Sequence, residues 1–296
     1  MATLYTQQNK NVTRTWLLMA VFLVIVIGIG YFLSYYYGNP FILYIAVAFS
    51  IVMNIVSYWY SDKIVTKLAG AKEVIREEYF DLYNIVENLS ITAGLPMPRV
   101  FVVTDSAPNA FATGRNKEHA VVCVTTGLLA ILNKTELEGV IGHELSHIGN
   151  RDILLSTVAA VLVGFVTILA DMFTRNLLWG GMRRRDDGEN NGGGVIVIIG
   201  IILMILSPIV ATLIQLAISR KREYLADASG ALLTRYPEGL ASALEKIGQY
   251  AQPLEHQSQA ISHLYIADPK GNVSRIALLF ATHPPIANRI KALIVK

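Results

Sequence analysis

Four long segments that lack any charged residue constrain this chain more than any other feature of its sequence. None of them contains Asp, Glu, Lys or Arg. Each meets or approaches the roughly 20 apolar residues that a helix needs to cross a bilayer. We therefore predict four membrane helices, at residues 16–37, 41–60, 153–170 and 195–219.

The composition agrees with a membrane protein. Of the 296 residues, 53% are hydrophobic and only 16% are charged, which is too apolar for an ordinary soluble enzyme of this length. The first apolar segment is longer than the roughly 7–15 residues of a signal peptide, and the sequence from Ser34 to Tyr37 is a poor cleavage site. We therefore expect a retained anchor, paired in a tight hairpin with the second helix across Gly38-Asn39-Pro40.

Basic residues predict the orientation of these helices. Cytoplasmic flanks are enriched in Lys and Arg. Such residues flank the predicted first, second and fourth helices, at Lys10, Arg14, Lys63, Lys67, Lys72, Arg76, Arg220, Lys221 and Arg222. Four arginines between the third and fourth segments oppose this assignment if both segments span the membrane: Arg175, Arg183, Arg184 and Arg185. The loop charges therefore leave the topology of the last two segments open.

The run Gly142-His143-Glu144-Leu145-Ser146-His147 predicts a catalytic zinc site. In a helix, two His residues four positions apart lie on one face, so both rings can bind one metal ion. Glu144 lies beside the open coordination position, as a general base would. The alternative is a solvated helix whose two His side chains bind nothing.

The residues around this motif predict a helix. Thr135-Glu136-Leu137-Glu138 has the form of a capping box, and a stop is expected near Gly149-Asn150. Apolar residues recur at helical spacing between these ends. They are Leu137, Val140, Ile141, Leu145 and Ile148.

A catalytic zinc ion needs a third protein ligand. We select Glu223, because Asp227 follows it at a spacing that places both carboxylates on one helix face. Asp227 would then orient a zinc-binding imidazole through a hydrogen bond. The alternative is a surface helix with two ordinary carboxylates. If Glu223 shares one ion with His143 and His147, the chain must return to the same side of the membrane, so the third and fourth segments both cross it or neither does. Because these segments begin just after His147 and end just before Glu223, the zinc ion would lie close to the membrane surface.

The polar parts of the chain predict an α+β fold. Glu73 to Ala93 has the pattern of an amphipathic helix, whereas Arg99 to Val103 and His119 to Thr125 are rich in Val and predict strands. Asn109 to Gly114 could add an edge strand. We thus expect a multi-pass α-helical membrane protein with a mainly helical zincin-like domain and a small β-sheet. The expected parts are a membrane hairpin (residues 1–61), the first part of the domain (62–152), a second hairpin (153–219) and the second part of the domain (220–296).

Other features exclude some classes of protein. The single cysteine, Cys123, rules out a disulfide within the chain and fits a buried strand position in a reducing compartment. The formal charge of +3 is small, and no basic array interleaved with aromatic residues indicates nucleic-acid binding. The lipid bilayer is therefore an expected partner, and nucleic acid is not.

Four motifs in order resemble those of the HtpX-type membrane zinc metalloproteases, which belong to the gluzincin class and are related to the CAAX prenyl protease. The resemblance covers essentially the whole chain. Along the chain, the motifs are Asn109 to Gly114, His143 to His147, Glu223 to Asp227, and Thr282-His283-Pro284-Pro285 with Arg289.

The resemblance implies one zinc ion and proteolysis of unfolded or damaged membrane proteins at the cytoplasmic face of the bacterial inner membrane, in quality control under stress. It implies that His283 and Arg289 lie near the metal, where they stabilise the oxyanion or hold other site residues. It also implies that a substrate strand binds along Asn109, Ala110, Phe111, Ala112 and Thr113. The sequence gives no specific substrate, cleavage preference or oligomeric state.

Two other classes stay open at this point. The chain could be a transporter with a structural zinc site, although the apolar segments lack the charged residues that mark ion paths. It could also be a membrane scaffold with a degenerate protease domain. The intact set of His143, Glu144, His147 and Glu223 argues against the scaffold.

Overall fold

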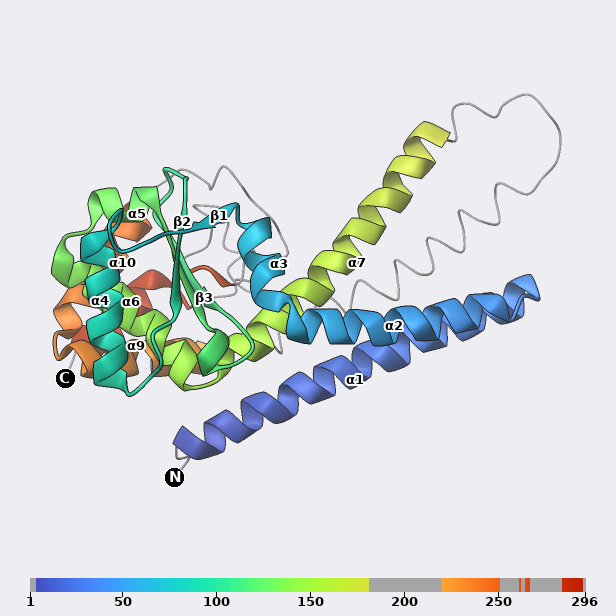
Figure 1. The fold of residues 1–296 in the computed structure, drawn as a ribbon, viewed down its shortest axis with the longest axis horizontal. Coiled ribbons are helices and arrows are strands. Elements are labelled where there is room, and N and C mark those ends of the chain that lie inside the picture. The colour runs from blue at the N-terminus through green and yellow to red at the C-terminus, as the bar shows by residue number, and fades with distance from the viewer. Residues whose placement is uncertain (1–3, 181–219, 251–260, 262–263, 267–283, 295–296) are drawn as a thin grey trace.

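Two long N-terminal helices form a hairpin that extends away from a folded domain (Figure 1). The structure is a computed structural model, and it describes residues 4–180, 220–250, 261, 264–266 and 284–294. The hairpin consists of α1 (Leu4–Tyr37) and α2 (Phe41–Trp59). Within the described part of the chain, these are the two helices long and apolar enough to cross a membrane. With 34 residues, α1 is about 51 Å long, so it exceeds the roughly 30 Å hydrocarbon core of a bilayer.

The third apolar segment forms most of α7 (Asp152–Gly180), which projects from the domain in Figure 1. Many of its side chains up to Val166 are buried within the protein. This part of α7 is long and apolar enough for a membrane span only when it is taken together with the preceding helix, α6, and the two helices meet at an angle of 86°. The predicted helix is therefore present, whereas a crossing stays a prediction. The fourth segment, residues 195–219, lies outside the described residues.

The described strands form one mixed sheet in the order β1-β2-β4-β3. β2 and β4 are parallel, and the two outer strands are antiparallel to their neighbours. The strands are β1 (Ala71–Glu73), β2 (Arg99–Val103), β3 (Ala110–Thr113) and β4 (Val121–Thr125). The predicted third strand is thus present as β3, at an edge of this sheet.

Two predicted element starts are wrong. The helix expected from Glu73 begins only at Phe80, as α4 (Phe80–Ala93), because Ala71–Glu73 pairs with β2 instead. The strand expected from His119 begins at Val121, because Lys117–His119 forms a 3₁₀ turn. In that turn the Asn116 side chain accepts a hydrogen bond from the His119 backbone N–H.

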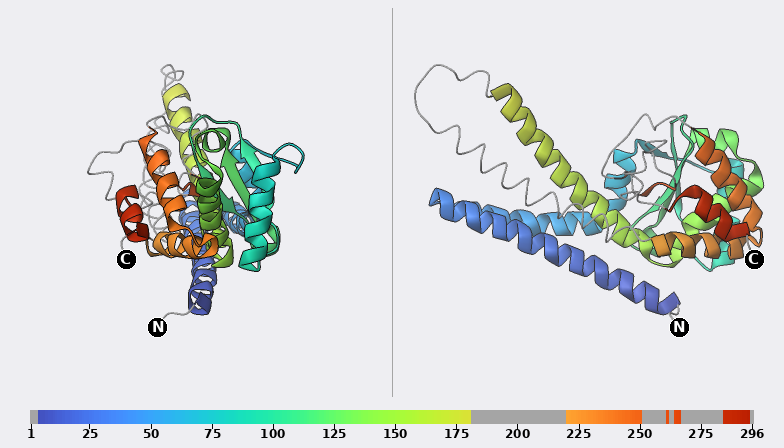
Figure 2. Two further views of the ribbon diagram at one scale, coloured as in Figure 1. Left: turned by 90° about the vertical axis from the view of Figure 1, so that its left-hand side faces the viewer. Right: turned by 180° about the vertical axis from the view of Figure 1, so that it is seen from behind.

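Helices cover both faces of the sheet (Figure 2). Successive residues of a strand point to opposite faces, so Val100 and Val122 pack with α4, α6 (Lys134–Gly149) and α10 (Pro237–Gln249). Cys123, on the other face, packs with α3 (Ser61–Leu68) and α7 and is buried, as predicted. The other helices in the described part of the chain are α5 (Thr126–Ile131), α9 (Arg220–Thr234) and α11 (Ile286–Ile294).

The helix that carries the zinc motif is α6, and its cap differs from the prediction. Asn133 accepts a hydrogen bond from the Glu136 N–H at 2.9 Å, and the Glu136 carboxylate accepts one from the Asn133 N–H at 2.8 Å. The capping box is therefore Asn133 with Glu136, and the predicted box of Thr135 with Glu138 is wrong. Asn caps a helix at least as well as Thr, and here the Thr135 hydroxyl donates to the Asn133 side chain. The helix ends at Gly149, where the sequence predicts its end.

Candidate metal centre and active site

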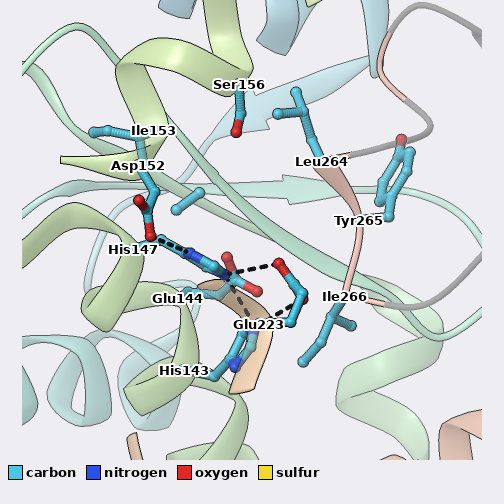
Figure 3. Close-up of a pocket in the computed structure, with 11 residues that line it drawn as sticks. His143, Glu144, His147, Asp152, Ile153, Ser156, Glu223, Leu264, Tyr265 and Ile266 are labelled. Carbon is cyan, nitrogen blue, oxygen red and sulfur yellow. Dashed lines mark hydrogen bonds and ion pairs between the residues drawn. The ribbon is translucent and has the colours of Figure 1, made fainter. Parts of the chain in front are cut away.

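Three potential metal ligands meet at the centre of the domain. His143 and His147 lie on the same face of α6, with their Nε2 atoms 3.1 Å apart (Figure 3). Glu223, from the first turn of α9, faces both rings. Its Oε2 lies 3.8 Å from the His143 Nε2, and its Oε1 lies 3.7 Å from the His147 Nε2.

The close approach of α6 and α9 brings Glu223 to these rings. The two helices touch at Gly142 and Gly230, where a Cβ atom on Gly230 would lie 2.8 Å from the backbone nitrogen of His143. A side chain at Gly230 would therefore force the helices apart. Because α9 follows the third and fourth apolar segments, the site joins parts of the chain that are distant in sequence.

The Nδ1 atoms of both rings face carboxylates. The His143 Nδ1 lies 2.9 Å from the Asp227 Oδ1, and the His147 Nδ1 lies 3.2 Å from the Asp152 Oδ2. An ionised carboxylate only accepts hydrogen bonds, so each Nδ1 carries the proton and each Nε2 presents a lone pair. Two lone pairs that face each other at 3.1 Å repel, so the site favours a cation between them, either a proton carried by one Nε2 or a metal ion bound by both.

The donor set fits zinc. The ligand atoms of His143, His147 and Glu223 all lie within 4.8 Å of one another. Around a tetrahedral zinc ion with bonds of about 2.0–2.1 Å, neighbouring ligand atoms are about 3.4 Å apart, close to the separations seen here. Two imidazoles and one carboxylate leave the fourth position open, as in a catalytic site. Burial would lower the pKa of His147, but the hydrogen bond with Asp152 and the charge of Glu223 raise it to about 9, so the site favours positive charge.

Arg289 holds Asp227 in place. Its side chain is fully buried and donates two hydrogen bonds to the Asp227 carboxylate, from Nε at 2.9 Å and from Nη2 at 2.7 Å. Burial would raise the pKa of Asp227, but the hydrogen bonds from Arg289 and His143 lower it to about 2. Asp227 is therefore ionised and can hold the proton of the His143 Nδ1. In this geometry Arg289 contacts a residue that orients a potential metal ligand, His143.

Glu144 lines the same pocket and is 2% exposed. Burial raises its pKa to about 7, and the charge of Glu223 contributes in the same direction. Its carboxylate accepts a hydrogen bond from the Ala112 backbone, on the edge strand β3. A carboxylate that titrates near neutral pH can both take up and release a proton there.

A short segment of the chain lies along β3, on the side away from β4. The Ile266 N–H donates to the Ala110 carbonyl at 2.9 Å, and the Tyr265 ring packs edge-on against Phe111 with centroids 5.2 Å apart. The Ile266 carbonyl in turn accepts a hydrogen bond from the Arg289 Nη1 at 2.8 Å. Figure 3 shows Leu264, Tyr265 and Ile266 on the side of the pocket opposite Asp152.

The structure thus brings together most of the residues that the sequence singles out. The three potential ligands, Glu144, Asp227 and Arg289 form one site, and Ala112 of the predicted substrate strand lines the pocket. His283 lies outside the described residues. Asp152 and Ile266 also belong to the site and were not predicted from the sequence. The only signal for Asp152 is its place directly after the predicted end of the motif helix.

Comparisons with known proteins agree with this geometry. The sequence pattern of peptidase family M48 matches residues 77–294. The chain is 48% identical over 294 residues to a protease HtpX homolog of Caldanaerobacter subterraneus, covering 98% of this chain and 97% of that protein. It is 48% identical over 282 residues to a protease HtpX homolog of Pyrococcus furiosus, covering 95% and 94% respectively.

The fold is similar to that of a solved protein, S. mikatae Ste24p. Its crystal structure matches with a TM-score of 0.52 at 20% sequence identity, over 94% of this chain and 62% of that one. At this identity the likeness concerns the fold alone. The match to the family pattern and to the HtpX homologs carries the assignment: the chain belongs to peptidase family M48, as an HtpX-type metalloprotease.

Proposed function

We propose that this protein is a membrane-bound, zinc-dependent endopeptidase that cleaves misfolded or damaged membrane proteins at the cytoplasmic face of the bacterial inner membrane, in quality control under stress. One observation carries the proposal. Two imidazoles, each held at Nδ1 by a carboxylate, face Glu223 with their lone pairs, and the buried Glu144 lies in the same pocket. A structural metal site has no need of such a base or of an open coordination position.

The residues of the site have distinct roles in the proposed reaction. His143, His147 and Glu223 would hold the zinc ion, which when bound supplies Lewis acidity and makes water more acidic. Glu144 takes a proton from the attacking water and passes it to the departing amine. Burial raises its pKa to about 7, which suits both steps near neutral pH, and a zinc ion beside it would lower that pKa. His283 is the proposed donor to the oxyanion.

The edge of β3 is the proposed binding surface for an extended substrate. A polypeptide can add to a free strand edge through backbone hydrogen bonds, which recognise any sequence in extended form. Such binding suits unfolded segments, because folded proteins rarely expose a free extended backbone. The Ala110 carbonyl accepts from Ile266 in this structure, so a substrate strand that pairs there must replace that hydrogen bond.

The membrane location is supported by the apolar hairpin and by the charges next to it. Lys10 and Arg14 precede the apolar part of α1, and Lys63 and Lys67 follow α2 in the short helix α3. Both flanks lie on the side that we propose is cytoplasmic. The domain that carries the active site follows directly, so the zinc centre would lie close to the membrane surface.

The proposal is tested by cleavage of a membrane protein in folded and destabilised forms. Both forms would be reconstituted in liposomes with the purified enzyme and zinc, and Glu144→Gln would serve as the control. We expect the wild-type enzyme to cleave the destabilised form much faster, and Glu144→Gln to cleave neither. Equal cleavage of both forms would contradict the quality-control role. Bound zinc without cleavage of either form would point to a structural metal site.

A further inference from the structure

Polar side chains near the start of α1 contact the end of the zinc-binding helix. The Gln8 amide donates to the Gly149 carbonyl at 2.7 Å, and the Asn11 amide donates to the Asn150 carbonyl at 3.2 Å. Asn11 is only 1% exposed, although it is polar and lies in the part of α1 before the apolar segment. Because α1 is longer than the hydrocarbon core is thick, this end can leave the bilayer and dock against the protein. Figure 2 shows α1 passing beneath the domain on its way to this contact.

The contact lies at a sharp corner between α6 and α7. The two helices meet at 86°, and Arg151 between them has a left-handed backbone with φ of 57°. This corner places Asp152, the first residue of α7, directly beside His147. Asp152 is 3% exposed, so its carboxylate depends on protein groups for its hydrogen bonds.

Each oxygen of the Asp152 carboxylate has its own partner. Oδ2 lies 3.2 Å from the His147 Nδ1, and Oδ1 accepts a hydrogen bond from the Asn11 side-chain amide. The Arg222 Nε lies further from Oδ1, at 3.9 Å. An unbroken chain of side-chain contacts thus runs from α1 through Asp152 to one of the metal ligands.

We propose that Asn11 is a positioning residue of the metal centre: by holding Asp152, it fixes the tautomer and orientation of the His147 ring. The inference rests on the zinc site of the proposed function. Asn11 is a neutral donor, so it fixes the carboxylate in place through Oδ1 without adding a charge, and leaves Oδ2 to face the His147 Nδ1. Partners of metal-binding His residues typically change metal affinity by about 10–100-fold when they are removed.

This role gives the first membrane helix a direct part in the active site. The apolar segment of α1 serves as an anchor, whereas its polar start completes the environment of a zinc ligand. A displacement of α1 from the domain would therefore weaken zinc binding without any change in the three ligands. Zinc affinity then reports whether the N-terminal hairpin is docked.

The test measures zinc affinity in the full-length protein in detergent, by competition with a chelator. Asp152→Asn should weaken zinc binding by about 10–100-fold, and Asn11→Leu by about tenfold. Gln8→Ala is the matched control, because it removes a contact of α1 with the same corner of the domain, at Gly149, without touching Asp152. It should leave zinc affinity unchanged. In the double variant, Asn11→Leu should add nothing to Asp152→Asn, because both act through the same carboxylate.

Two results would overturn the inference. One is wild-type zinc affinity in Asn11→Leu, and the other is an equal loss in Gln8→Ala, which would assign the effect to general docking of α1. If Asn11→Leu does not fold, Asn11→Ala removes the same amide without adding bulk and allows the same comparison. Absence of zinc from the wild-type protein would contradict the proposed function itself, so the two failures are distinguishable.

Discussion

Removal of the Arg289 guanidinium should destabilise the domain through Asp227. The pKa of Asp227 falls from 3.8 to about 2 in the folded protein, since hydrogen bonds from Arg289 and His143 overcome the effect of burial. At 1.36 kcal/mol per pH unit, this difference corresponds to about 2–3 kcal/mol of stability at neutral pH. Arg289→Met would also leave a buried carboxylate without its cation, and such losses typically cost about 3–5 kcal/mol.

The assay is thermal unfolding in detergent, with Lys291→Met as the control. Lys291 lies on the same helix, α11, but is exposed, so its replacement removes a charge without breaking a buried pair. For a domain of this size, a loss of 3–5 kcal/mol should lower the unfolding midpoint by roughly 6–20 °C. Arg289→Lys should give an intermediate loss, because an ammonium group cannot reproduce the two-pronged contact.

The pH dependence provides an independent check. The folded pKa of Asp227 is lowered, so its stabilising contribution is fully present above about pH 4 and is lost as the pH falls towards 2. Without Arg289, burial raises the pKa of Asp227, so the difference between wild type and Arg289→Met should be largest at neutral pH and shrink as the pH falls towards 2. An Arg289→Met midpoint at pH 7 equal to that of Lys291→Met would refute the reasoning.

Three further predictions concern catalysis and helix packing. Glu144→Gln should keep its zinc but lower kcat by about 100- to 10,000-fold, as measured by peptide cleavage and metal analysis; comparable turnover would exclude Glu144 as the base. The pH profile of kcat/KM should fall on the acid side with an apparent pKa at or below about 7, because Glu144 must be ionised and nearby zinc lowers its pKa; a flat profile from pH 5 to 8 would contradict this role. Gly230→Ala should lower both the unfolding midpoint and zinc affinity, since its Cβ would lie 2.8 Å from the His143 backbone nitrogen. Gly248→Ala should have a smaller effect, because the atom nearest to its Cβ would be a side-chain carbon of Ile286 at 3.1 Å.

Local rules allowed much of the site to be predicted from the sequence. A spacing of four residues places His143 and His147 on one helix face whatever the rest of the fold does. The same argument pairs Glu223 with Asp227. The described geometry brings these four residues together, as expected.

Errors arose where several local signals compete. Two overlapping capping boxes precede α6, and Asn133 forms the cap where Thr135 was predicted. Residues from Glu73 to Tyr79 have a helical pattern, but Glu73 pairs with β2 and the Val74 N–H bonds to the Val100 carbonyl. Tertiary pairing thus overrides the local preference.

Two contacts between distant parts of the chain could not be predicted. Asn11 and Asp152 are 141 positions apart, and no spacing rule connects them. The same holds for Ile266 and the edge of β3. Both contacts depend on how α1, α7 and the C-terminal segment pack around the sheet, and this packing is set by the whole fold.

We propose that two imidazoles and one carboxylate hold a catalytic zinc ion. Metal analysis of the purified protein, together with X-ray absorption at the zinc edge, would identify the metal and its ligand atoms. We predict one zinc ion per chain, bound by nitrogen and oxygen atoms at about 2.0–2.2 Å, and loss of the metal in Glu223→Ala. A sulfur ligand, or full zinc content in Glu223→Ala, would contradict the account.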